Sequence, residues 1–122
     1  MALFNRLFEP VAKRANILEI RTEKECRALF AQEFAVIFKH SKSCNLSQHA
    51  YRTVLEFCAE RPDANIHLLC VIGSRAAALF VEEQTGVRHE SPQLLAMRYG
   101  TVFAHASHQH ITPGFLEKIH QA

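Results

Sequence analysis

Hydrophobic residues follow two alternating patterns along the chain. Residues 34–38 (FAVIF) and 66–72 (IHLLCVI) are continuous apolar runs with the length of a buried strand. In residues 45–60, and again in the segment that ends at Thr85-Gly86, apolar residues recur every three or four positions, as in a helix packed on one face. The alternation predicts two parallel strands joined by a right-handed helical crossover.

The regions on either side of this unit have their own signals. Upstream, Thr22 and Glu25 have the spacing of a capping box, which predicts a helix over about 23–32. Downstream, residues 93–98 and 101–106 are short strand candidates, and the Tyr99-Gly100 pair between them suits an antiparallel hairpin. Thr112 as N-cap and Pro113 at the first helical position then predict a closing helix.

We therefore expect an α/β fold with the order α-βαβα-ββα, a three-layer sandwich around a mixed four-stranded sheet. The folded domain is expected to span residues 22–122. Residues 1–21 are interpreted as an N-terminal extension that packs on the domain, because Leu3, Phe4 and Leu7 have helical spacing.

Composition narrows the class of protein. The chain has 122 residues, 48% of them hydrophobic, which suits one globular domain. The formal net charge is only +2 and the basic residues are scattered among acidic ones, which disfavours a nucleic-acid groove or a polybasic membrane patch. No apolar stretch has the length of a membrane-spanning helix, and the first residues do not resemble a signal peptide, so we expect a cytoplasmic protein.

Three of the four cysteines fit the apolar pattern and one does not. Cys26, Cys58 and Cys70 occupy apolar positions of their segments, so we expect them to be buried and unpaired. Cys44 follows a polar loop and opens the predicted helix. Cys58 would lie about 20 Å further along that helix, too far for a disulfide. The absence of a C-x-x-C pair disfavours a zinc site.

The position of Cys44 favours a reactive thiolate. Free backbone N–H groups and the positive end of the helix dipole meet at a helix N-terminus. Lys39, His40 and Lys42 add positive charge nearby, and Ser47, one turn on, is placed to donate a hydrogen bond to the sulfur. The C-x-x-S pattern gives one nucleophile with no local resolving thiol. The alternative is a buried cysteine that happens to begin a helix.

The order of elements, a cysteine at the first strand-to-helix junction and a proline just before the hairpin together resemble the thioredoxin fold. Three segments resemble, in order and spacing, the signature blocks of the YtxJ family, the monothiol bacilliredoxins of the bacillithiol system. They are FKHSKSCNLS (38–47), TGVRHESPQ (85–93) and HASHQHIT (105–112). The resemblance covers about residues 17–120.

This resemblance implies a cytoplasmic enzyme that removes bacillithiol from S-bacillithiolated proteins, with bacillithiol as co-substrate and no bound cofactor. It implies that Cys44 is the nucleophile and that Pro92 is a cis-proline facing it, with backbone groups of Ser91 pairing with the extended substrate. Many family members carry T-C-P-x-S, whereas Ser43 and Asn45 flank the cysteine here. The departure leaves the nucleophile intact and affects only the fine tuning of thiolate stability.

Two alternatives remain at this stage. His105, His108 and His110 lie close enough in sequence for two of them to bind a metal ion, with His40 and His89 near the same edge; no acidic or thiolate ligand lies among the first three, which disfavours a metal site. The fold would also suit a non-catalytic thiol sensor or adaptor. Turnover separates the two functions, because a sensor reacts once and stops. The oligomeric state stays open.

Overall fold

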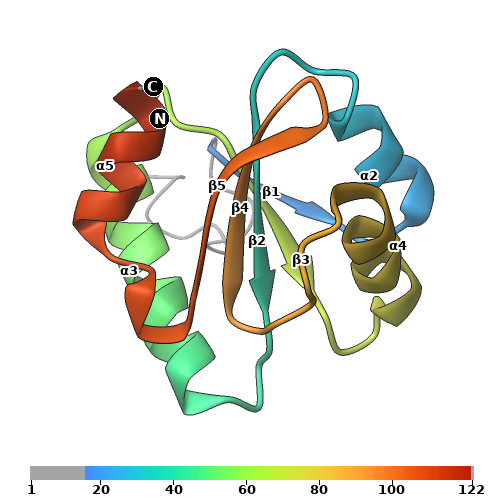
Figure 1. Ribbon diagram of the computed structural model, residues 1–122. Helices are drawn as coiled ribbons and strands as arrows, with labels where there is room; N and C mark the ends of the chain where they lie inside the picture. The colour runs from blue at the N-terminus through green and yellow to red at the C-terminus, as the bar shows by residue number, and fades with distance from the viewer. Residues whose placement is uncertain (1–15, 122) are drawn as a thin grey trace, which may run out of the picture.

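A mixed five-stranded sheet with helices on both faces forms the centre of the protein, in a computed structural model that describes residues 16–121 (Figure 1). The strands are ordered β1-β3-β2-β4-β5, and β2 is parallel to β3 but antiparallel to β4. The elements are β1 (Ile17–Ile20), α2 (Glu23–Leu29), β2 (Ala35–His40), α3 (Asn45–Glu60), β3 (Ile66–Cys70), α4 (Arg75–Thr85), β4 (Gln93–Arg98), β5 (Thr101–Ser107), the 3-10 helix η2 (His108–His110) and α5 (Pro113–Gln121).

Each face of the sheet has its own hydrophobic core. Helices α3 and α5 cover one face and α2 and α4 cover the other (Figure 1). Side chains alternate along β2, so Val36 and Phe38 enter the α3/α5 core, whereas Ile37 enters the α2/α4 core. Burial on both faces explains why β2, β3 and β4 are continuous apolar runs.

The expected four-stranded sheet is wrong in one respect, because β1 adds a fifth strand. It pairs in parallel with β3 from Ile17 opposite Ile66 to Ile20 opposite Leu69. An edge strand of four residues with an exposed second position gives too short a pattern to read from sequence. The remainder of the proposed extension, residues 1–15, lies outside the described residues.

Local signals at the helix ends are confirmed. The Thr22 and Glu25 side chains form the full capping box of α2, and Gly86 ends α4 with a left-handed φ of 72°. The Thr112 hydroxyl accepts the Phe115 N–H at 3.1 Å at the start of α5. Helix α2 is shorter than expected because it gives way to i→i+3 turns that run to Gln32.

The β4–β5 hairpin turns through two residues with positive φ, Tyr99 at 48° and Gly100 at 79°. Gly100 also lies against the connection that follows α2. A Cβ atom there would stand 3.0 Å from the Phe30 carbonyl oxygen and 3.2 Å from the Phe30 Cβ. This glycine is therefore required both by its dihedral angle and by the close approach of the two segments.

We expect Gly100→Ala to destabilise the fold more than Gly86→Ala does. Both substitutions place a side chain in the left-handed region, at a cost of about 1–2 kcal/mol, but only Gly100 would meet other atoms within 4 Å. Urea unfolding of the two variants measures the difference. Equal losses would show that the Phe30 contact relaxes without cost.

Candidate active site

Cys44 stands where the chain leaves the sheet and enters its longest described helix. Strand β2 ends at His40, three loop residues follow, and Cys44 is the N-cap of α3 (Figure 1). Its side chain is partly exposed and unpaired, and it makes no capping hydrogen bond. The N–H groups of the first turn, which an N-cap oxygen would normally occupy, are left for a sulfur anion or for a substrate atom at this position.

The loop before Cys44 is held by side chains of α3. The buried Ser47 hydroxyl accepts the Ser41 N–H at 2.8 Å and lies 2.9 Å from His40 Nδ1. The Gln48 amide donates to the Lys42 carbonyl at 2.8 Å. Within residues 16–121 these bonds occupy the Ser47 oxygen in place of the expected bond to the Cys44 sulfur. Ser47 therefore fixes the loop that precedes Cys44.

His40 contributes a hydrogen bond rather than a positive charge. The ring is buried, its centroid lies 4.6 Å from that of Tyr51, and Nδ1 faces Ser47. Burial, followed by the nearby Lys42 charge, lowers the pKa of His40, so the imidazole is largely neutral at pH 7. Of the basic residues expected near the thiol, Lys42 is the one that lies in the loop, where it is exposed.

Lys39 does not lie beside the thiol either. It points to the opposite face of the sheet, where it is fully buried and its Nζ lies 3.1 Å from His89 Nδ1. The His89 N–H in turn donates to Glu82 Oε2 at 2.6 Å. Burial lowers the pKa of Lys39 to about 8. Sequence reasoning missed this contact because 50 positions separate its partners.

The segment between α4 and β4 carries the predicted cis-proline. The Ser91-Pro92 bond is cis and Pro92 is buried, which confirms that expectation. The Pro92 carbonyl accepts the His108 N–H at 3.0 Å, joining the segment to η2. His108 holds a left-handed φ of 54° to do so. The backbone groups of Ser91, expected to pair with substrate, stay a prediction.

Two pockets border this segment. His89 lines a pocket of about 250 Å³ together with Val71, Ile72, Arg75, Ala78 and Leu79. The neighbouring residue, Glu90, lines a pocket of about 490 Å³ with His105, Ala106, Ser107, His110 and Phe115.

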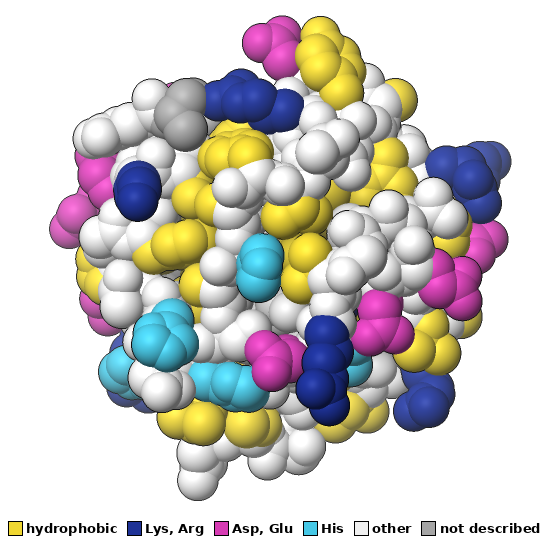
Figure 2. Space-filling view, viewed as in Figure 1, with side chains coloured by type: hydrophobic (Ala, Val, Ile, Leu, Met, Phe, Trp, Pro, Cys, Tyr) yellow, Lys and Arg dark blue, Asp and Glu magenta, His cyan; other side chains and the backbone are white. Residues whose placement is uncertain are grey.

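Histidines surround Glu90. Figure 2 shows histidine side chains gathered at the lower left of this face beside acidic and basic side chains. A hydrogen bond from Ser107, then the charges of His108, Arg88 and His105, lower the pKa of Glu90. Across residues 16–121 no three His, Cys, Asp or Glu side chains are grouped so as to hold a metal ion.

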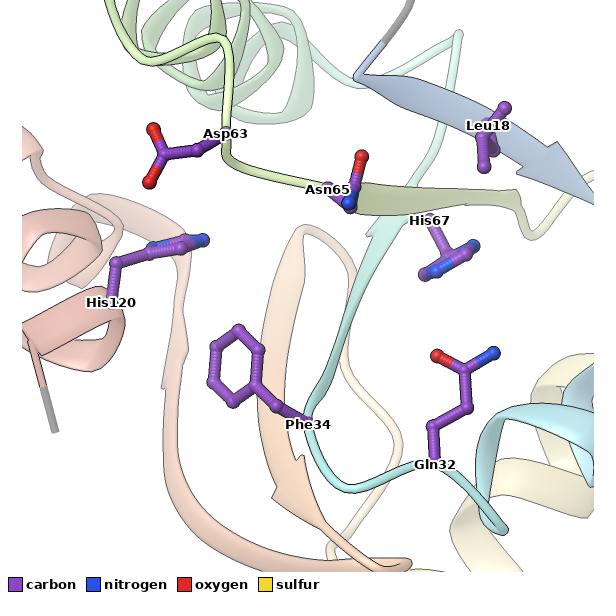
Figure 3. Close-up of a pocket in the computed structure, with 7 residues that line it drawn as sticks. All are labelled: Leu18, Gln32, Phe34, Asp63, Asn65, His67 and His120. Atoms are coloured by element: carbon purple, nitrogen blue, oxygen red, sulfur yellow. The ribbon is translucent and has the colours of Figure 1, made fainter.

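A third pocket, of about 300 Å³, lies at the other end of the sheet (Figure 3). Phe34 and Asn65 immediately precede β2 and β3, so this pocket is at the amino ends of the strands, away from Cys44. Figure 3 shows His120 and Asp63 on one side of it and His67 and Gln32 on the other. It takes no part in the thiol site.

The sequence matches a known protein family over most of its length. The family model for the monothiol bacilliredoxin BrxC matches residues 18–116. The chain belongs to this family. The resemblance to monothiol bacilliredoxins found in the sequence is thereby confirmed, and the bacilliredoxin family and the fold indicate a thiol oxidoreductase.

Solved structures confirm the fold. A protein described as having a thioredoxin fold is 24% identical, with a TM-score of 0.78 over 84% of this chain and 92% of that chain. Mitochondrial thioredoxin 3 from Saccharomyces cerevisiae is 16% identical, with a TM-score of 0.68 over 93% and 100%. Thioredoxin from Trypanosoma brucei brucei is 13% identical, with a TM-score of 0.71 over 93% and 96%.

A membrane-spanning helix is not found among residues 16–121, where every helix is too short or too polar to cross a bilayer.

The lowered pKa of Lys39 predicts a pH-dependent stability. The group titrates near 8 in the folded protein and near its ordinary value of 10.5 when unfolded. Between these values the unfolded chain binds more protons, so the contribution of Lys39 to the free energy of unfolding increases with pH. Urea titrations of the wild type and Lys39→Met from pH 7 to 10.5 should show the wild type gaining stability relative to the variant. A constant difference would contradict a depressed pKa.

Proposed function

We propose that this bacilliredoxin removes bacillithiol from S-bacillithiolated proteins through Cys44 alone. The observation that carries the proposal is a partly exposed, unpaired cysteine at the N-terminus of α3, with Ser47 rather than a second cysteine one turn on. The other three cysteines are buried. A thiol with no resolving partner suits the exchange of a small thiol between two disulfides.

In the first step the Cys44 thiolate attacks the bacillithiol sulfur of the modified protein. The bond between that sulfur and the protein cysteine breaks, the electron pair leaves with the protein sulfur, and a proton from solvent completes the restored thiol. Cys44 now carries bacillithiol in a mixed disulfide. Backbone N–H groups at the start of α3 favour the anion that attacks and later leaves.

In the second step a free bacillithiol thiolate attacks the bacillithiol sulfur bound to Cys44. This regenerates the Cys44 thiolate and releases bacillithiol disulfide, in which the bacillithiol of the adduct is joined to the attacking one. The electrons that reduce the protein sulfur therefore come from the one free bacillithiol consumed in each cycle. No other residue of the chain changes oxidation state. A reductase for bacillithiol disulfide must act elsewhere.

We assign substrate positioning to the Ser91-Pro92 segment, which leads into β4. An extended substrate would add main-chain hydrogen bonds to the backbone of Ser91, just before β4. The thiol is held from the other side by the loop bonds of Ser47 and His40.

Turnover tests the proposal against the thiol sensor or adaptor. A bacillithiolated protein is supplied in tenfold excess over the bacilliredoxin with bacillithiol present, and mass spectrometry follows the loss of adduct. Release of more than one equivalent per chain supports an enzyme. A single equivalent followed by arrest would overturn the catalytic proposal in favour of a sensor.

Cys44→Ser should abolish debacillithiolation, because an alcohol cannot carry thiol–disulfide exchange. Cys58→Ser, the matched control at a buried cysteine, should retain it. Intact-mass analysis after addition of bacillithiol disulfide should show one adduct per chain, on Cys44, reversible by bacillithiol. An internal disulfide that includes Cys44 would indicate a dithiol mechanism instead.

Ser47→Ala should slow the reaction about fivefold without stopping it, since a net hydrogen bond contributes about 1 kcal/mol. The substitution removes the acceptor for the Ser41 N–H and the partner of His40, but the helix N-terminus remains. Single-turnover kinetics with a bacillithiolated peptide measures the effect. Loss as complete as that of Cys44→Ser would give Ser47 a direct part in the chemistry.

A further inference from the structure

Two consecutive residues at the end of β2 anchor opposite halves of the site. Side chains alternate along a strand, so His40 points to the α3 face and Lys39 to the α2/α4 face. His40 binds Ser47 in the first turn of the helix that begins at Cys44. Lys39 binds His89, in the segment that leads to Pro92. The second of these anchors has no part in the chemistry described so far.

The Lys39 ammonium lies in a nearly closed environment. The residue has no solvent exposure, and its Nζ lies 3.1 Å from His89 Nδ1. Since an ammonium group can only donate, His89 Nδ1 accepts, and the remaining imidazole proton is on Nε2. Burial and the Lys39 charge both lower the pKa of His89, which keeps the ring in this accepting form at neutral pH.

Further bonds fix the same segment, residues 86–92. The His89 N–H donates to Glu82 of α4 at 2.6 Å. Gln93, the cross-strand partner of Lys39, is buried on the same face and donates to the Arg88 carbonyl at 2.9 Å. The segment is therefore tied to β2, to α4 and to β4 just before the cis bond.

The charges around the pair come from every element packed against it. Glu82 of α4 and Cys26 of α2 face Lys39. Glu82, Arg75 and Glu90 face His89 in addition to Lys39 itself. Glu82 is thus the carboxylate that acts on both residues, and it accepts the backbone N–H of His89 while Lys39 donates to the His89 ring.

Burial of the Lys39 ammonium group costs desolvation free energy and so opposes folding. Its neighbours on this face, Ile37 and Leu95, are apolar and fully buried, and burial of an ammonium group loses hydration that a single neutral hydrogen-bond partner returns only in part. A methionine would fill the same space. The fold alone therefore gives no reason for a lysine here.

We propose that Lys39 and His89 are positioning residues, a buried tether that holds the Ser91-Pro92 segment at the distance from Cys44 that a protein substrate requires. The proposal rests on the function proposed above, because the substrate is the bacillithiolated protein. It assigns the tether to substrate binding and not to the reactivity of the thiol, which His40 and Ser47 support from the other face.

Lys39→Met and His89→Phe test the tether, since each removes one polar partner. Methionine has nearly the volume of lysine, and phenylalanine keeps a planar ring in place of the imidazole. With a bacillithiolated peptide as substrate, we expect KM to rise five- to tenfold while kcat changes less than twofold. Alkylation of Cys44 by iodoacetamide should proceed at the wild-type rate. Because the two residues act as one unit, the double variant should be no worse than either single variant.

Hydrogen–deuterium exchange provides a readout that needs no bacillithiol. Peptides that span residues 86–92 should exchange faster in both variants, while peptides from the first turn of α3 should be unchanged. His67→Phe is the matched control. It removes a buried imidazole in β3 that lies on the same face of the sheet as Lys39, but at the opposite end of the strands.

Three results would overturn the tether. They are unchanged exchange in residues 86–92, an equal fall in kcat and in the alkylation rate, or additive losses in the double variant. If His67→Phe lost activity to the same extent, the effect of the two tether variants would be one of general stability, and this too would overturn the tether. If the wild type shows no turnover, the proposed function fails, whereas faster exchange in the variants still demonstrates the tether itself.

Discussion

The register of β2 within the sheet is the constraint on which the site depends. This strand is bonded on both sides, to β3 in parallel and to β4 in antiparallel orientation. A slip by one residue would exchange the faces of Lys39 and His40. The imidazole would then lose Ser47 and the ammonium would enter the α3/α5 core. The apolar residues before them oppose such a slip by their shapes, because Val36 and Phe38 fill one core and Ala35 and Ile37 the other.

Sequence patterns predicted most of the fold because its helices and inner strands have strong periodic signals. Helix α3 and the hairpin were found to within about a residue, and the cis-proline and the buried cysteines were as expected. Strand β1 was missed because its four residues are too few to show a period. An edge strand is defined mainly by its pairing with a neighbour. Neither the residues of β1 nor those of β3 indicate by themselves that the two strands pair.

Within the site, the place of Cys44 could be predicted but the contacts around it could not. The pattern of the sequence placed Cys44 at the start of α3, and that is a local property. The partner of Ser47 depends on the rotamer of a buried imidazole, and the partner of Lys39 lies 50 residues away. Proximity in sequence suggested that three basic side chains surround the thiol. The alternation of β2 sends one of them to the other face, and burial leaves His40 largely neutral.

The burial of three cysteines also makes the chain a reporter of its own folding. Cys26, Cys58 and Cys70 have at most 7% of their surface exposed, and burial raises the pKa of all three thiols, to about 11 for Cys26 and Cys58. A water-soluble thiol reagent therefore meets one accessible sulfur in the native protein and four in the unfolded chain. A fluorescent or spin label can be placed at Cys44 without removing another residue, and the count of reactive thiols measures the unfolded fraction directly.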